Sequence, residues 1–135
     1  MKLLRFGNAG EEKPGLIDQS GKIRDLSSVI DDINGNTIAP ESLDKLKNLD
    51  TSSLPEVNGN PRIGPCVNNV GKFLCIGLNF SDHAAETGAE AHEEPILFSK
   101  ATSAIIGPND NVEIPRTSTA TDWEVELGII IGKKT

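Results

Sequence analysis

Aromatic and basic residues are scarce in this sequence of 135 residues. It has no Tyr, one Trp and four Phe, and 20 Asp and Glu outnumber 13 Lys and Arg, which gives a formal net charge of -7. A protein that binds nucleic acid needs clustered cations for the phosphates and, for single strands, aromatic rings on which bases stack. The basic residues are scattered along an acidic chain, so we expect no nucleic-acid partner.

Cysteine and long apolar runs are also rare. Cys66 and Cys75 lack the CxxC spacing of a redox or zinc motif, and we predict that both are small residues of the core. The opening segment "MKLLRFGNAGEE" contains no apolar run of the length of a signal peptide or a membrane span. These features predict no membrane partner and a reduced, cytoplasmic location.

The turn and loop signals predict a first, small accessory domain over residues 1–70. Three short strand-like runs open it, at residues 1–6, 15–18 and 22–26. A helix is expected to begin at Pro40, because proline suits a first helical turn and leucines recur at helical spacing after it. This part of the sequence shows no pattern of catalytic or binding residues.

Residues 71–135 have the pattern of a second, strand-dense domain. A nearly continuous apolar run predicts a buried strand over 73–78. After it, Ser81 or Asp82 can cap a short helix that Gly88 ends. Further strands are predicted at 95–100, 111–115 and 123–131. The whole chain is therefore expected to have a mixed, mainly β fold in which a small α+β domain precedes the second domain.

Two glutamates, Glu124 and Glu126, stand two residues apart in "TDWEVELGIIIGKK". On a strand they would point to one face, opposite Trp123, Val125 and Leu127. Two ionised carboxylates on one face of an apolar strand repel each other, so a proton, a Lys or Arg, or a metal ion must offset the repulsion. Carboxylates with water suit Mg²⁺, Mn²⁺ or Ca²⁺. Taken alone, the pattern also fits ordinary surface charge on a solvated strand.

A histidine and a glutamate, His83 and Glu86, stand three residues apart in "DHAAE". On a helix they would share one face and could form a hydrogen bond. A carboxylate beside an imidazole orients the ring and raises its basicity, which suits a general base that activates water. Taken alone, the spacing is more typical of a surface pair on an acidic helix, because such pairs arise by chance. The other histidine, His92, lies in "AEAHEEP" without a partner pattern, and we interpret it as a surface residue.

Three segments in this order, "GLNFSDHAAETG", "EPILFSKATSAIIGPNDNVEIP" and "TDWEVELGIIIGKK", closely resemble the fumarylacetoacetate hydrolase family. The resemblance is strong over residues 62–135. Within this family, the sequence most resembles the bacterial branch that contains 2-hydroxyhepta-2,4-diene-1,7-dioate isomerases, ureidoglycolate lyases and diketo-deoxy-sugar-acid hydrolases. The opening of the chain also looks like the N-terminal domain of that branch.

The resemblance implies a role for each residue singled out above. Glu124 and Glu126 match two glutamates that hold the family's divalent metal, expected to be Mg²⁺ or else Mn²⁺ or Ca²⁺. His83 and Glu86 match an acid/base dyad on a short helix. Lys100 lies in a family block, but no catalytic role is assigned to it. The implied fold is a mixed β-roll, usually dimeric, of which residues 71–135 would form the first part.

The reaction that the resemblance implies is cleavage of a C–C bond in an acylpyruvate or 2,4-diketo acid by way of a metal-bound enolate. An isomerase or a ureidoglycolate-type lyase on the same scaffold is the alternative, because these reactions share the enolate step. The family's third metal ligand, an Asp, would lie beyond residue 135. A truncated, inactive fragment is therefore a third hypothesis for this chain.

Overall fold

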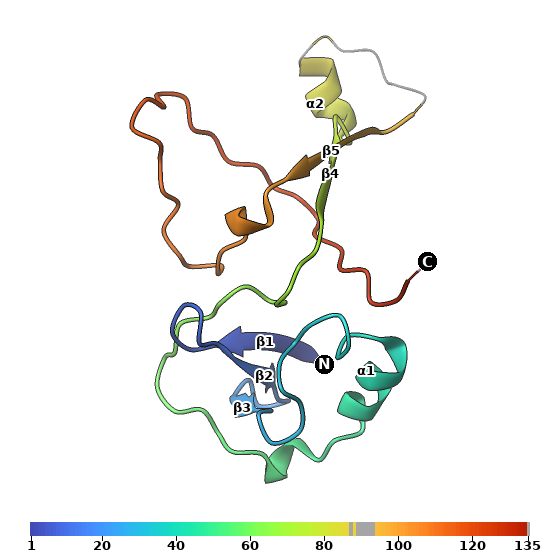
Figure 1. The fold of residues 1–135 in the computed structure, drawn as a ribbon, viewed down its shortest axis with the longest axis vertical. Coiled ribbons are helices and arrows are strands. Elements are labelled where there is room, and N and C mark those ends of the chain that lie inside the picture. The colour runs from blue at the N-terminus through green and yellow to red at the C-terminus, as the bar shows by residue number, and fades with distance from the viewer. Residues whose placement is uncertain (87, 89–93, 135) are drawn as a thin grey trace. The chain divides into compact units, whose positions relative to one another are not determined.

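The computed structural model describes the whole chain except residues 87, 89–93 and 135, and the side chains of residues 83 and 84 (Figure 1). The chain divides into two units, one of Met1–Asn69 with Ile106–Thr135 and the other of Val70–Ile105. The predicted boundary between two domains at residue 70 stays a prediction. Whether residues 71–135 form a single domain remains a prediction.

An antiparallel three-stranded sheet opens the first unit, with the order β1 (Lys2–Phe6), β2 (Lys13–Ile17) and β3 (Ile23–Asp25). These strands confirm the three predicted runs. The hairpin between β2 and β3 closes around Asp18, whose carboxylate accepts the backbone N–H groups of Ser20 and Lys22. Gly21 follows with a φ of 82°, a conformation that glycine adopts without the steric cost of a side chain.

Helix α1 (Pro40–Lys47) forms where it was predicted, with Pro40 in its first turn. The short 3₁₀ helix η1 (Thr51–Ser53) follows, and Asp50 caps it by accepting the N–H of Ser52. Leu46 of α1 is buried, and Leu54, directly after η1, forms a core cluster with Leu16 and Leu26. The buried apolar residues are Leu4, Phe6, Leu16, Leu26, Ile33, Leu46 and Leu54.

The second unit is a β-hairpin with a helix between its strands. Strands β4 (Phe73–Gly77) and β5 (Ile96–Lys100) pair antiparallel, and helix α2 (Ser81–Glu86) follows β4. A 3₁₀ helix, η2 (Thr102–Ala104), comes after β5. The predicted strands over 73–78 and 95–100 and the predicted short helix are confirmed.

The prediction that the strand over 73–78 is buried is wrong. Its residues alternate between half-buried and exposed, and those of β5 are all exposed. In the part of the chain that the structure describes, this sheet has two strands and no third strand beside it, so its apolar faces are left open. The predicted burial of both cysteines is also wrong, because Cys66 is exposed and Cys75 is half-buried.

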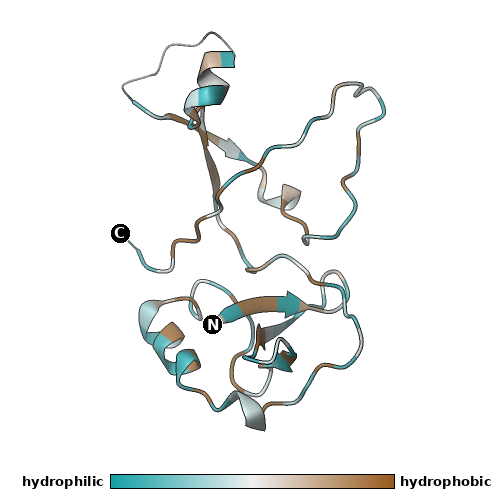
Figure 2. Cartoon of the chain, turned by 180° about the vertical axis from the view of Figure 1, so that it is seen from behind, coloured by the Kyte–Doolittle hydropathy of each residue, from teal (hydrophilic) through white to brown (hydrophobic). Residues whose placement is uncertain are grey.

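The predicted strands over 111–115 and 123–131 are not formed in this structure. Both segments lack regular secondary structure, although Figure 2 shows that the segment leading to the C-terminus is rich in apolar residues. Trp123, Val125 and Leu127 are each more than 80% exposed. A strand exists only where a neighbour completes its hydrogen-bond ladder, and the described residues offer these segments none.

Taken as a whole, the fold is mixed and mainly β, with few helices, as predicted. None of the helices in the described ranges combines the length and the apolar composition needed to cross a membrane.

Candidate functional site

The turn between β4 and α2 places the predicted acid/base residues directly after a strand. Leu78, which follows β4, has a φ of 50°. This left-handed conformation costs a non-glycine residue about 1–2 kcal/mol. Backbone strain of this kind gathers at functional sites, where the surrounding structure holds it in place.

Helix α2 carries both members of the predicted dyad, His83 and Glu86. It ends at Glu86, and the glycine expected to end it, Gly88, follows two positions later with a φ of 68° and an N–H that donates to the carbonyl oxygen of Ala85. The side chain of Glu86 is exposed, whereas the side chain of His83 lies outside the described residues. The pairing of the imidazole with the carboxylate therefore stays a prediction. His92, interpreted above as a surface residue, lies outside the described residues.

The predicted metal ligands, Glu124 and Glu126, are both exposed in the irregular segment after the second unit. The strand that was predicted to place both carboxylates on one face is not formed here. Two carboxylates are a hard oxygen donor set, and this chemistry fits Mg²⁺, Mn²⁺ or Ca²⁺. Among the residues whose placement the structure describes, no group of three or more His, Cys, Asp or Glu lies close enough to hold a metal ion. The carboxylates of the two glutamates are thus suitable ligands for a divalent cation, but a complete site would need further ligands.

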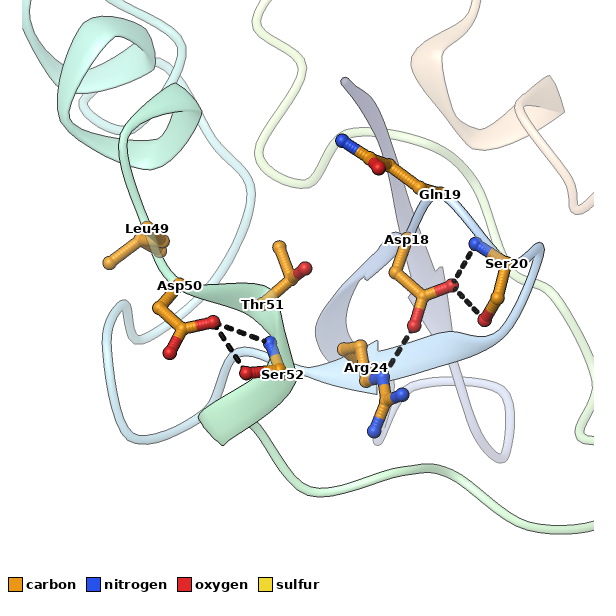
Figure 3. A pocket seen from close by; sticks show the side chains of 8 residues that line it. All are labelled: Asp18, Gln19, Ser20, Arg24, Leu49, Asp50, Thr51 and Ser52. Atoms are coloured by element: carbon orange, nitrogen blue, oxygen red, sulfur yellow. Dashed lines mark hydrogen bonds and ion pairs between the residues drawn. The ribbon is translucent and has the colours of Figure 1, made fainter.

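A polar pocket lies in the first unit, between the β2–β3 hairpin and η1 (Figure 3). Asp18 accepts hydrogen bonds from the backbone and hydroxyl of Ser20 and from Nε of Arg24, at 2.7–2.8 Å. These bonds hold the pKa of Asp18 well below its ordinary value. Asp50 likewise accepts the hydroxyl and N–H of Ser52, which lowers the pKa of Asp50.

The groups that line this pocket serve the turns around it. The spacing Asp-x-Ser at 18–20 and at 50–52 is typical of turns in which a carboxylate binds the backbone two residues on. Arg24 is already bound to Asp18 and to the carbonyl oxygen of Leu54. The pocket is therefore explained by local structure and is not our candidate site.

A network of ionised side chains in the first unit was missed in the sequence. Arg5, Glu12, Asp32, Arg62 and Asp110 are joined by ion pairs, although they stand far apart along the chain. Such ion pairs are hard to predict from sequence, because charged residues scattered over more than a hundred positions show no regular spacing that would link one to another. A buried arginine on the apolar strand β1 was the one available sign, since Arg5 follows Leu3 and Leu4 and precedes Phe6.

Comparison with known proteins places the predicted residues in one family segment. Residues 72–135 match the family described as fumarylacetoacetate (FAA) hydrolase, C-terminal. This segment contains His83, Glu86, Glu124 and Glu126. The match supports the prediction that these four residues belong to a segment of this family. Their individual roles stay predictions.

Curated relatives match almost the whole chain. A putative hydrolase of Burkholderia orbicola is 54% identical over 134 residues, which are 99% of this chain and 48% of that protein. A putative hydrolase of Burkholderia lata is 54% identical over 132 residues, 98% of this chain and 47% of that protein. The chain thus spans about half the length of the curated relatives that it matches.

A solved structure shares the fold. The fumarylacetoacetate hydrolase of Exiguobacterium antarcticum aligns with a TM-score of 0.58 and 24% identity, and the alignment covers 84% of this chain and 40% of that one. The family match and the shared fold confirm the resemblance predicted from the three sequence segments. Residues 72–135 are therefore similar to the C-terminal part of the fumarylacetoacetate hydrolase family.

Proposed function

We propose that this chain supplies the first part of a divalent-metal-dependent hydrolase that cleaves a C–C bond in an acylpyruvate or 2,4-diketo acid. The observation that carries the proposal is the single family segment, 72–135, in which the H-x-x-E and E-x-E motifs both lie. Hydrolase-like function is supported by the relatives at 54% identity. The substrate and the metal are parts of the proposal.

In this proposal, Glu124 and Glu126 hold the cation. When bound, Mg²⁺ or another hard divalent ion supplies a Lewis acid for the oxygens of a 2-oxo acid. The two carboxylates contribute negative charge, which favours a cation and disfavours the bare substrate carboxylate. Binding of an anionic substrate at this place therefore depends on the metal, and the metal depends on these two residues.

The proposed role of His83 is to take a proton from water at an imidazole nitrogen while the water oxygen adds to the distal carbonyl carbon. Glu86 orients the ring and stabilises the imidazolium that results. When the C–C bond breaks, the same proton can pass to the carbon that leaves, so that one water molecule is consumed for each bond cleaved. This acid/base sequence uses the three-residue spacing of the motif, which on a helix is expected to bring two side chains to one face.

An isomerase or a ureidoglycolate-type lyase is the second candidate, because both motifs would serve these reactions on the same scaffold. For hydrolysis the activated water is essential, whereas an isomerisation needs only proton transfer at carbon. The proposal also includes a homodimer in solution. An inactive fragment is the third candidate for the 135-residue chain by itself, given that it spans about half the length of its relatives.

The experiment that separates these candidates uses this chain alone and the chain extended by the remaining half of the Burkholderia orbicola relative. Both proteins are tested with Mg²⁺ on a set of acylpyruvates, a dienedioate and ureidoglycolate. We expect the extended protein to hydrolyse an acylpyruvate and the shorter chain to be inactive. Turnover of the dienedioate or ureidoglycolate alone would replace the hydrolase proposal with the corresponding alternative. No turnover of any substrate by the extended protein would contradict the proposed function.

A further inference from the structure

The turn at residues 106–110, "IGPND", is bound to the N-terminal part of the first unit by one arginine. Nε of Arg62 donates to Oδ1 of Asp110 at 2.7 Å, and its Nη2 donates to Oδ2 of the same carboxylate. The third nitrogen, Nη1, donates to Glu12 at 2.8 Å and to the carbonyl oxygen of Gly7 at 3.2 Å. The guanidinium thus binds the turn with one edge and the β1–β2 connection with the other.

A second arginine holds Glu12 and the loop behind it. Arg5 is 5% exposed, and its Nε and Nη2 donate to Asp32 at 2.7 and 3.0 Å. Its Nη2 also lies 3.5 Å from Glu12, whose side chain is 6% exposed. Asn68 donates a further hydrogen bond to Asp32 at 2.7 Å. Each buried carboxylate of the network therefore has at least two donors, which offsets the cost of burying it.

The turn also approaches the N-terminal part of the unit closely at its backbone. A Cβ on Gly107 would collide with the carbonyl oxygen of Ile63 and would lie 3.1 Å from the Cα of Gly64. Within the turn, the N–H of Gly107 binds Oδ2 of Asp110 at 2.7 Å, and the N–H of Asp110 binds the carbonyl oxygen of Gly107 at 3.1 Å. The carboxylate of Asp110 is thus shared between the turn and Arg62.

From these contacts we infer that Arg62 is a tether that fastens the turn at 106–110 to the N-terminal part of the chain and so fixes where the segment with Glu124 and Glu126 begins. The turn lies inside the family segment, whereas Arg62, Glu12 and Gly7 lie before it. The paired donation by one planar guanidinium is a geometry that lysine cannot reproduce. The tether does not depend on the proposed reaction.

Two substitutions test the tether with little disturbance of the fold. Asp110→Asn keeps the shape of the side chain and an oxygen for the N–H of Gly107, but removes the charge that Arg62 binds. Arg62→Lys keeps a cation and removes the paired donors. The matched control is Asp44→Asn, which removes the same charge from an exposed pair with Lys47, where the side chain of Asp44 is 70% exposed. Such an exposed pair contributes little to stability.

The position of the turn is measured by NMR, with a nitroxide on the exposed Cys66 in a protein whose second cysteine is replaced by Cys75→Ser. In the parent protein, the label should broaden the amide signals of Gly107 and Asp110, because the turn is held beside Ile63 and Gly64. In Asp110→Asn, loss of a charge-assisted pair should raise the ratio of released to held turn by about tenfold or more, so the broadening of these signals should weaken measurably. Asp44→Asn should leave them broadened.

The amide of Phe6 reports whether the fold has survived, since Phe6 forms a β-bridge with Ile63. The nitroxide should broaden the Phe6 amide signal in the parent protein and in both tether variants. If the Phe6 signal recovers in Arg62→Lys, that substitution has disturbed the sheet, and the tether is then judged from Asp110→Asn alone. Signals of Gly107 and Asp110 that stay equally broadened in Asp110→Asn would overturn the tether.

Discussion

Gly15 shows how a single missing Cβ sets the packing of the first sheet. It lies opposite Leu4 in the β1–β2 ladder, and a Cβ at this position would be 3.0 Å from the ring of Phe6 and 3.2 Å from the carbonyl oxygen of Arg24. Because neither the ring nor the neighbouring strand can withdraw without loss of core packing, Gly15→Ala should destabilise the protein by about 1–3 kcal/mol. The measurement is the midpoint of urea unfolding.

Gly35→Ala is the matched control for that substitution. A methyl group on Gly35 would meet no atom within 4 Å beyond its chain neighbours, and the backbone of Gly35 does not have a positive φ. Its replacement should leave the midpoint unchanged or raise it slightly, because alanine restricts the unfolded chain. Equal midpoints for the two variants would contradict the close packing of Phe6 on Gly15.

The network of ionised side chains predicts how the stability of the protein depends on pH in the acid range. The hydrogen bond from Arg62 lowers the pKa of Glu12 from its ordinary 4.5 and that of Asp110 from 3.8. For Asp32, burial raises the pKa, but the hydrogen bonds from Arg5 and Asn68 outweigh it, so this pKa is also below 3.8. A lowered pKa in the folded state adds stability that is present above the ordinary pKa and is lost as the pH falls through the lowered one.

The free energy of unfolding should therefore be steady at neutral pH and fall below about pH 4.5. We expect Asp110→Asn to have a shallower acid limb than the parent, because one of the three carboxylates no longer titrates. Chemical unfolding at a series of pH values measures both limbs. An acid limb of the same steepness in the two proteins would show that Asp110 does not contribute to this dependence.

The two predicted site motifs can be separated by substitution in the extended protein. Glu124→Ala removes a proposed metal ligand, so activity should fall on every substrate, and excess Mg²⁺ should recover part of it. His83→Ala should leave Mg²⁺ binding nearly intact and lower hydrolysis by about 10²–10⁴-fold, the usual contribution of a positioned general base. Calorimetry with Mg²⁺ and turnover of an acylpyruvate measure the two effects. Loss of Mg²⁺ binding in His83→Ala would show that the dyad assignment is wrong.

At the scale of elements, sequence patterns correctly predicted the helices and strands whose formation depends on residues nearby in the chain. Helix α1 begins at Pro40 as expected, since the proline ring has the φ of a helix and its missing N–H is not needed there. The three strands of the first sheet are joined by short turns, so each finds its neighbour within a few residues. The helix α2 and the glycine after it were predictable for the same reason.

Elements that depend on distant partners were not predictable in the same way. The segment 123–131 has the composition of a strand, but composition cannot supply the neighbouring ladder. The tether joins Arg62 to Asp110 across 48 positions, and no spacing in the sequence links these two charges. For the candidate site, the residues were found from the resemblance to a family, whereas their arrangement in space depends on such long-range contacts.

At the scale of the whole molecule, the exposed apolar residues after the tether are the main departure from an ordinary folded protein. Six of them lie between 123 and 131, and each is at least half exposed: Trp123, Val125, Leu127, Ile129, Ile130 and Ile131. Single exposed apolar residues are normal, but a continuous series of them is typical of a surface that binds another protein segment, a partner or a ligand. The relatives, which are about twice as long as this chain, have further sequence that could cover it.

This exposure leads to a prediction that the only tryptophan of the chain can report. Trp123 is 87% exposed, so its fluorescence in the 135-residue chain should be readily quenched by iodide. In the chain extended by the remaining half of the Burkholderia orbicola relative, with any added Trp replaced by Phe, pairing of 123–131 as a strand should bury the indole on the face opposite Glu124 and Glu126. Quenching should then fall several-fold and the emission should move to shorter wavelength.

The extended chain in denaturant is the control, and it should be quenched as strongly as the shorter chain. Equal quenching of the two native proteins would mean that residues 123–131 do not form a buried strand, and the two glutamates would then lack the shared face on which the proposed metal site depends.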